Sequence, residues 1–137
     1  MDFVLDCSVT MAWCFEDQVT PYTETALEAL SSGQALVPSI WTLDVANVLL
    51  VAERHGRVKA ADSARFLSLL KGLPIVIDGE TSEHAWNGVL HTGREFCLSS
   101  YDAAYLDLSM RAGVELATLD TRLRKAAEEA GLRVFAL

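Results

Sequence analysis

Short apolar runs alternate along the chain with longer segments in which apolar residues recur every three or four positions. The first run, Phe3-Val4-Leu5, has the length of a buried strand and ends at Asp6. Glycines such as Gly56 and Gly113 follow helical segments and predict their ends. The whole pattern predicts strands at 3–5, 35–37, 75–77, 115–117 and 133–135, and helices at about 8–16, 21–32, 40–55 (capped by Ser39), 59–70, 81–92, 100–112 and 121–130.

This alternation predicts the fold class. Continuous apolar strands separated by helices are typical of a parallel sheet that is covered on both faces. We therefore expect an α/β protein, a three-layer α/β/α sandwich with a mainly parallel sheet. The length of 137 residues suits one domain, 1–137, and no linker or repeat interrupts it. The order of the strands does not follow from the pattern.

Charge is distributed unevenly. The formal net charge is −8, and eight of the 19 acidic residues precede Arg54, the first basic residue. A simple basic patch for nucleic acid is therefore disfavoured, although bound cations can reverse the local sign. The acidic first part of the chain is either a solvated surface, a docking site for a basic partner or part of a metal site.

Composition also bears on location. The three cysteines show no metal-ligand spacing and cannot all pair with one another, which favours reduced thiols. The first residues lack the basic and apolar regions of a secretion signal, and no apolar run approaches the length of a membrane span. We expect a cytoplasmic protein with no membrane contact.

Four aspartates stand at places where parallel α/β folds bind ligands. Asp6 and Asp120 follow predicted strands, whereas Asp44 and Asp102 lie in the first two turns of predicted helices. Strand carboxyl ends and helix amino ends generally open on the same side of such a sheet. The topology therefore predicts that all four carboxylates share one cleft.

Each aspartate also has a purely structural explanation. Asp102 and Asp120 are in positions typical of helix capping, and Asp6 suits a turn after a strand. Asp44 is less easily explained, because it shares a helix face only with Asn47 in an otherwise apolar stretch. Asp107 is five residues beyond Asp102, about 140° round the helix, so we expect it to point away from the cleft and be solvated.

Crowded carboxylates repel one another unless a cation neutralises them. Oxygen ligands without Cys or His partners suit Mg²⁺ or Mn²⁺ better than Zn²⁺. Such a site can polarise a phosphoryl oxygen and lower the pKa of a bound water. Ser8, which lacks the sequence setting of a hydrolase nucleophile, is either a helix cap or a residue that orients Asp6.

Four segments together resemble one family. Val-Leu-Asp-Cys-Ser, Pro-Ser-Ile-Trp-Thr-Leu-Asp-Val-Ala-Asn-Val-Leu, Ser-Tyr-Asp-Ala-Ala-Tyr-Leu-Asp-Leu and Leu-Ala-Thr-Leu-Asp-Thr-Arg-Leu are similar, in order and spacing, to PIN domains of the VapC toxin type. The resemblance covers essentially the whole chain. It implies a three-layer α/β/α fold, Mg²⁺- or Mn²⁺-dependent endoribonuclease activity on RNA, a homodimer and inhibition by a VapB-type antitoxin.

The resemblance also assigns roles to residues. Asp6, Asp102 and Asp120 match the family's acidic positions, which act as metal or water ligands. Asp44 occupies the position that normally holds Glu, so its shorter side chain is expected to reach the metal through water. Ser8 and Thr118 are similar to the small hydroxyl residues that flank the first and last acids.

Three functions remain as alternatives at this point. The first is the metal-dependent endoribonuclease, with its antitoxin docking on the apolar and acidic residues 10–50. The second is a PIN-like binding module with weak or no nuclease activity, which the substitution at Asp44 favours. The third, a phosphatase of another α/β family, is disfavoured because no second aspartate stands two residues after Asp6.

Overall fold

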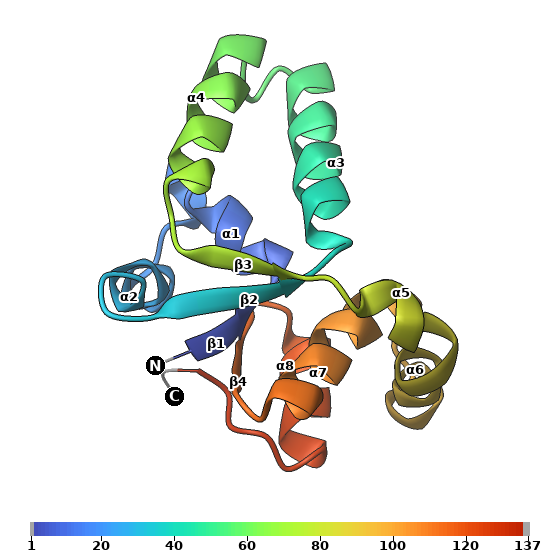
Figure 1. The fold of residues 1–137 in the computed structure, drawn as a ribbon. Coiled ribbons are helices and arrows are strands. Elements are labelled where there is room, and N and C mark those ends of the chain that lie inside the picture. The colour runs from blue at the N-terminus through green and yellow to red at the C-terminus, as the bar shows by residue number, and fades with distance from the viewer. Residues whose placement is uncertain (1, 136–137) are drawn as a thin grey trace.

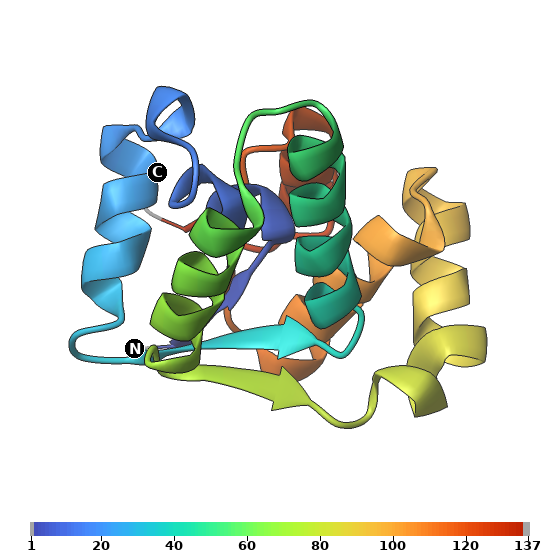
Figure 2. The ribbon, with the colours of Figure 1, turned by 90° about the horizontal axis from the view of Figure 1, so that it is seen from above.

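A computed structural model describes residues 2–135 of the chain. Its centre is a sheet of four parallel strands in the order β3-β2-β1-β4. Figures 1 and 2 show α3 and α4 side by side on one side of this sheet and α7 and α8 on the other. The elements are β1 (Asp2–Leu5), α1 (Cys7–Ala12), η1 (Glu16–Gln18), α2 (Pro21–Ala29), β2 (Gln34–Pro38), α3 (Trp41–Arg54), α4 (Ala60–Lys71), β3 (Ile75–Asp78), α5 (Thr81–His84), η2 (Ala85–Val89), α6 (Leu90–Phe96), α7 (Ser100–Ala112), β4 (Glu115–Ala117) and α8 (Thr121–Glu129).

The parallel sheet with helices on both sides confirms the predicted fold class. The strand order adds what the sequence could not supply. From β1 the chain adds β2 and β3 on one side, and then returns to place β4 on the other. The carboxyl ends of β1 and β4 thus form the point at which the strand order reverses, where open α/β sheets bind their ligands.

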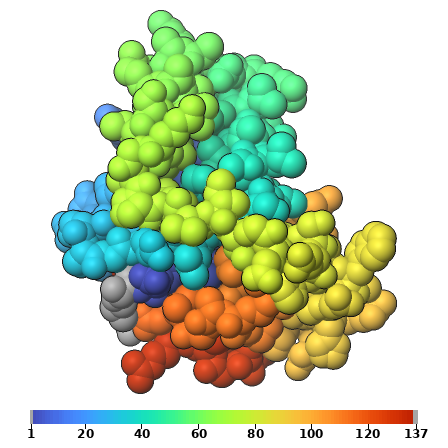
Figure 3. All heavy atoms as spheres, viewed as in Figure 1, coloured from blue at the N-terminus to red at the C-terminus, as the bar shows by residue number. Residues whose placement is uncertain are grey.

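The core lies against β1 and α7. Phe3, Val4 and Leu5 are fully buried, and every residue from 103 to 109 is buried as well. Helix α7 packs on β1, β2 and β4 and so fixes its amino end beside the carboxyl ends of those strands. In the space-filling view α3 and α4 project above the sheet, and the segment of α5 and α6 extends to one side (Figure 3). No helix within residues 2–135 is long and apolar enough to cross a membrane.

Most predicted elements are present, but three predictions about where elements begin, end or form differ from the structure. The first helix stops at Ala12 and is followed by the short helix η1, instead of continuing to 16. Ser39 makes no cap, because Ile40 is the N-cap residue of α3 and makes no side-chain capping bond. The predicted strand at 133–135 is reduced to one isolated bridge between Leu116 and Val134.

The predicted helix at 81–92 is divided into α5, the π-helical turn η2 and α6, and Asp107, which lies against η2, points away from the hollow as expected but is not solvated. Asp107 is buried, with 5% of its surface exposed, and accepts a hydrogen bond of 2.9 Å from Nε of Arg111. Arg111 also binds Asp78 at 2.9 Å, so the arginine stabilises two carboxylates that water does not reach freely. The π-helical turn η2 passes Gly88 directly over Asp107.

Gly88→Ala is expected to destabilise the fold by about 1–3 kcal/mol, as overpacking of a tight core site generally does. A Cβ atom at Gly88 would lie 2.5 Å from Oδ1 of Asp107, whose carboxylate is held by Arg111. Urea unfolding of the two proteins measures the difference. Gly79→Ala is the matched control, since nothing lies within 4 Å of a Cβ there. Equal stability of the two variants would contradict the prediction.

Candidate metal centre

The four predicted aspartates line one open hollow of about 560 Å³. Asp6 follows β1 directly, and Asp120 follows β4 and caps α8. Asp44 and Asp102 come from the first turns of α3 and α7. The hollow therefore lies at the reversal point of the strand order, and residues 114 positions apart in the chain, Asp6 and Asp120, meet there because parallel strands end on one side.

Asp6 is the most enclosed of these carboxylates, with 6% of its surface exposed. Its Oδ2 accepts hydrogen bonds from Oγ of Ser8 at 2.6 Å and from Oγ1 of Thr118 at 2.8 Å. Burial raises the pKa of Asp6 to about 6, against the opposing effect of these two hydroxyl groups, and the charges of Asp102 and Asp120 raise it further. Asp6 is thus a carboxylate whose ionised form needs a positive neighbour.

The two hydroxyl groups also join the first turn of α1, just after β1, to the segment that follows β4. Oγ of Ser8 accepts a hydrogen bond of 3.0 Å from the backbone N–H of Leu119, and Oγ1 of Thr118 accepts one of 3.0 Å from the N–H of Asp120. Oδ1 of Asp120 caps α8 by accepting from the N–H groups of Arg122 and Leu123 at 2.8 and 3.2 Å. Asp6 and Asp120 are therefore held in one rigid frame of short hydrogen bonds.

Asp44 and Asp102 form the other side of the hollow. Oδ2 of Asp44 accepts a hydrogen bond of 2.8 Å from the hydroxyl group of Tyr105, one turn beyond Asp102 on α7. Burial raises the pKa of Asp44, while the bond from Tyr105 opposes the shift. Burial also raises the pKa of Asp102, and the charges of Asp120 and Asp44 add to it. The backbone N–H of Asp102 donates to Oγ of Ser99, which caps α7.

The chemistry of the donors fits a hard divalent cation. The side chains are carboxylates and hydroxyls, and Oδ1 of Asp6 makes no hydrogen bond within residues 2–135. Their spacing is wider than that of a closed cage, because no three Asp, Glu, His or Cys side chains in the described chain converge on one point. The arrangement fits an ion that keeps part of its water shell, as Mg²⁺ generally does. Direct ligation by each aspartate stays a prediction.

The sequence pattern did not reveal that two further side chains, those of Tyr105 and Arg57, line the hollow. Tyr105 lies three positions after Asp102, so the helical spacing that places both on one face could have revealed it. Arg57 comes from the loop between α3 and α4 and lines the same hollow. Nothing in its sequence setting indicates this position, because it depends on how the end of α3 packs over Phe15.

The fold and the hollow define the class of protein: a parallel α/β domain with an acidic site at the reversal point of its sheet. The sequence matches the PIN domain family over residues 3–129, and the chain belongs to this family. PIN domains are generally nucleases, and those nucleases generally use divalent metals. A comparison with curated proteins gave no match.

Solved structures share the fold. PAE2754 from Pyrobaculum aerophilum is 23% identical, with a TM-score of 0.65 over 92% of this chain and 87% of that one. VapBC2 from Rickettsia felis, bound to a DNA fragment from its promoter, is 10% identical, with a TM-score of 0.69 over 98% and 97% of the two chains. A toxin-antitoxin complex from Klebsiella pneumoniae is 18% identical, with a TM-score of 0.60 over 87% of each chain.

Proposed function

We propose that this chain is an endoribonuclease toxin of the VapC type, which hydrolyses RNA phosphodiester bonds with Mg²⁺ or Mn²⁺. The observation that supports it most is the meeting of Asp6, Asp44, Asp102 and Asp120 round one hollow. Membership of the PIN family and the likeness to toxin-antitoxin structures support the same function.

The residues of the hollow would have different roles in this reaction. The four aspartates would hold the cation and its water ligands, with Asp6 oriented by Ser8 and Thr118 and Asp44 by Tyr105. A bound divalent cation would polarise the phosphoryl oxygen and lower the pKa of the attacking water. Burial and the charge of Asp44 raise the pKa of Tyr105, so its hydroxyl group stays protonated and continues to donate to Asp44.

A cleavage assay on RNA tests this function. The protein is stripped of metal with a chelator and incubated with total RNA. We expect no cleavage until excess Mg²⁺ or Mn²⁺ is added, because the carboxylates alone cannot neutralise the charge that develops on the phosphate. Sequencing of the new ends then locates the cleaved positions. Cleavage that persists at full rate in the chelator, or no cleavage with either metal, would reject the proposal.

A PIN-like binding module with weak or no nuclease activity is the second candidate. The observation that favours it is Asp44 itself, which is short, hydrogen-bonded to Tyr105 and part of a set that does not close on one point. Asp44→Glu extends the carboxylate by one methylene and decides between the two. If the native protein is a nuclease, we expect the variant to change its cleavage rate by less than about tenfold. A module would show cleavage only in the variant.

We also propose that an antitoxin of the VapB type covers part of the acidic first third of the chain, and that the toxin forms a homodimer. Glu16, Asp17, Glu24 and Glu28 are all exposed there and carry no basic neighbour in sequence. A partner with basic and apolar side chains would complement this surface. Co-purification with the product of a neighbouring gene tests the pairing. Binding that is unchanged after charge reversal at these four positions would contradict the docking site, and light scattering measures the assembly.

A further inference from the structure

The acidic hollow has one basic residue in its lining among residues 2–135, and this residue is Arg57. Four carboxylates repel the phosphates of an approaching nucleic acid, and a positively charged side chain fixed beside them would attract those phosphates. On the basis of the proposed function, we infer that Arg57 binds a phosphate of the RNA next to the cleaved bond and exchanges Asp17 for that phosphate when RNA enters.

The backbone of Arg57 is held firmly by the end of α3. Gly56 has a left-handed conformation with φ of 73°. Its N–H donates to the carbonyl of Glu53 at 3.1 Å, and the N–H of Arg57 donates to the carbonyl of Ala52 at 2.9 Å. These two bonds form a Schellman motif, which ends the helix and fixes the direction of the chain that follows. Arg57 therefore leaves the helix at a defined place above the hollow.

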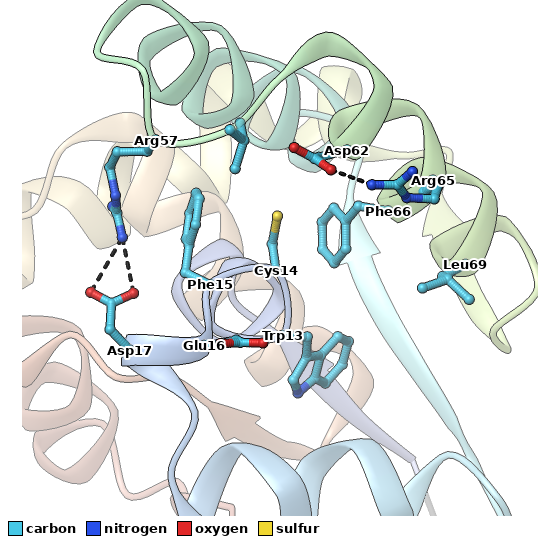
Figure 4. A pocket seen from close by; sticks show the side chains of 11 residues that line it. Trp13, Cys14, Phe15, Glu16, Asp17, Arg57, Asp62, Arg65, Phe66 and Leu69 are labelled. Carbon is cyan, nitrogen blue, oxygen red and sulfur yellow. Dashed lines mark hydrogen bonds and ion pairs between the residues drawn. The ribbon is translucent and has the colours of Figure 1, made fainter.

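The side chain of Arg57 has a defined direction, but it makes few hydrogen bonds. The guanidinium carbon lies 4.2 Å from the centre of the ring of Phe15, which is buried and forms a rigid support. Nη2 donates to the two carboxylate oxygens of Asp17 at 3.0 and 3.3 Å, as Figure 4 shows. The other guanidinium nitrogens make no hydrogen bond within the described residues. A planar guanidinium with free donors is suited to bidentate contact with a phosphate.

The present partner of Arg57 is easily replaced. The Asp17 side chain is 73% exposed and that of Arg57 is 42% exposed, so water screens this ion pair and it contributes little to stability. Arg57 also lines the neighbouring groove of about 1010 Å³ between α4 and the segment 13–17 that follows α1. It thus stands where the acidic hollow and the groove meet, and an RNA strand that crosses from one to the other must pass it.

Binding measurements in an inactive chain test this inference. Asp102→Asn serves as the background, and a labelled single-stranded RNA reports affinity by fluorescence anisotropy at several salt concentrations. Arg57→Gln is expected to weaken binding by about threefold to tenfold and to lower the slope of log affinity against log salt by about 0.7, the value for one lost phosphate contact on a single strand. Arg65→Gln is the matched control, because Arg65 lines the groove but not the acidic hollow and pairs with Asp62.

A second pair of variants tests the exchange itself. Asp17→Asn releases Arg57, whereas Glu16→Gln removes the same charge from a neighbouring exposed residue. We expect Asp17→Asn to tighten RNA binding by about twofold to fivefold more than Glu16→Gln, because only the former removes a competitor of the phosphate. Equal effects of these two variants would overturn the exchange.

The outcomes separate this inference from the proposed function. In the chain that retains Asp102, Arg57→Gln is expected to raise KM for RNA more than it lowers kcat. If RNA binds and is cleaved but Arg57→Gln leaves affinity and salt slope unchanged, or Arg65→Gln weakens binding as much, the role of Arg57 is wrong and the ribonuclease stands. If the chain neither binds nor cleaves RNA, both fail.

Discussion

Asp6→Asn is expected to abolish RNA cleavage while leaving the metal-free protein at least as stable as the native one at about pH 7.5. The amide keeps an oxygen that can accept from Ser8 and Thr118, so the hydrogen bonds that join α1 to the segment after β4 are retained. It cannot carry the negative charge that a cation needs. We expect the cleavage rate to fall by at least about a thousandfold, as removal of an essential electrostatic group generally causes.

The expected stability of the metal-free Asp6→Asn variant follows from the pKa of Asp6. That pKa rises from an ordinary value of 3.8 to about 6 in the folded chain, so the native state holds the proton more tightly than the unfolded state. The contribution of the protonated Asp6 carboxyl group to folding stability is therefore fully present below about pH 4 and is lost as pH rises through about 6. At 1.36 kcal/mol per pH unit, the loss amounts to about 3 kcal/mol at neutral pH. Asn does not ionise and avoids this loss.

Urea unfolding at about pH 4 and about pH 7.5 measures the effect in the metal-free proteins. We expect the difference in stability between Asp6→Asn and the native protein to grow in favour of the variant as pH rises. Asp2→Asn is the control, since Asp2 stands at the opposite end of β1 from the hollow. Retained cleavage in Asp6→Asn would remove Asp6 from the mechanism. If Asp6→Asn instead became less stable relative to the native protein as pH rises, this would contradict the burial of the Asp6 carboxyl group and its repulsion by neighbouring carboxylates.

The sequence was informative where local chemistry decides structure. Apolar runs and left-handed glycines such as Gly113 indicated where strands and helices end. The common side of parallel strand ends indicated that Asp6 and Asp120 meet. Helical spacing correctly placed Asp107 away from the hollow but wrongly predicted that it is solvated, because its burial depends on Arg111, on Asp78 and on a glycine of a distant turn. A carboxylate that looks solvated from helical spacing can be buried when its partner lies on the next turn.

The details of the site depend on packing between helices, which spacing along one chain does not reveal. Asp44 could be recognised as an unusual acid in an apolar helix, but its bond to Tyr105 requires the amino-terminal parts of α3 and α7, which cover opposite sides of the sheet, to meet at the hollow. Arg57 reaches the hollow only because the end of α3 lies above Phe15. The sequence thus predicted the charge of the site, whereas the structure supplied the groups that orient that charge.

Added Mn²⁺ is expected to stabilise the protein, and to do so more strongly at about pH 7.5 than at about pH 5. Because the pKa of Asp6 is raised to about 6, this carboxyl group is mostly protonated at about pH 5 in the metal-free protein, and a cation must displace its proton in order to bind. Burial also raises the pKa values of Asp44 and Asp102, and the charges of Asp120 and Asp44 raise that of Asp102 further. Protons and metal thus compete for one set of oxygens.

Thermal unfolding with and without the metal measures this competition. A ligand at one hundred times its Kd stabilises the folded state by about 2.7 kcal/mol, which for a chain of this length raises Tm by roughly 5–10 °C. We expect a rise of this size at about pH 7.5 and a rise less than half as large at about pH 5. The variant Asp6→Asn should show little rise at either pH. An equal rise at both values, or an undiminished rise in the variant, would mean that the metal binds away from Asp6 and that the hollow is not the metal centre.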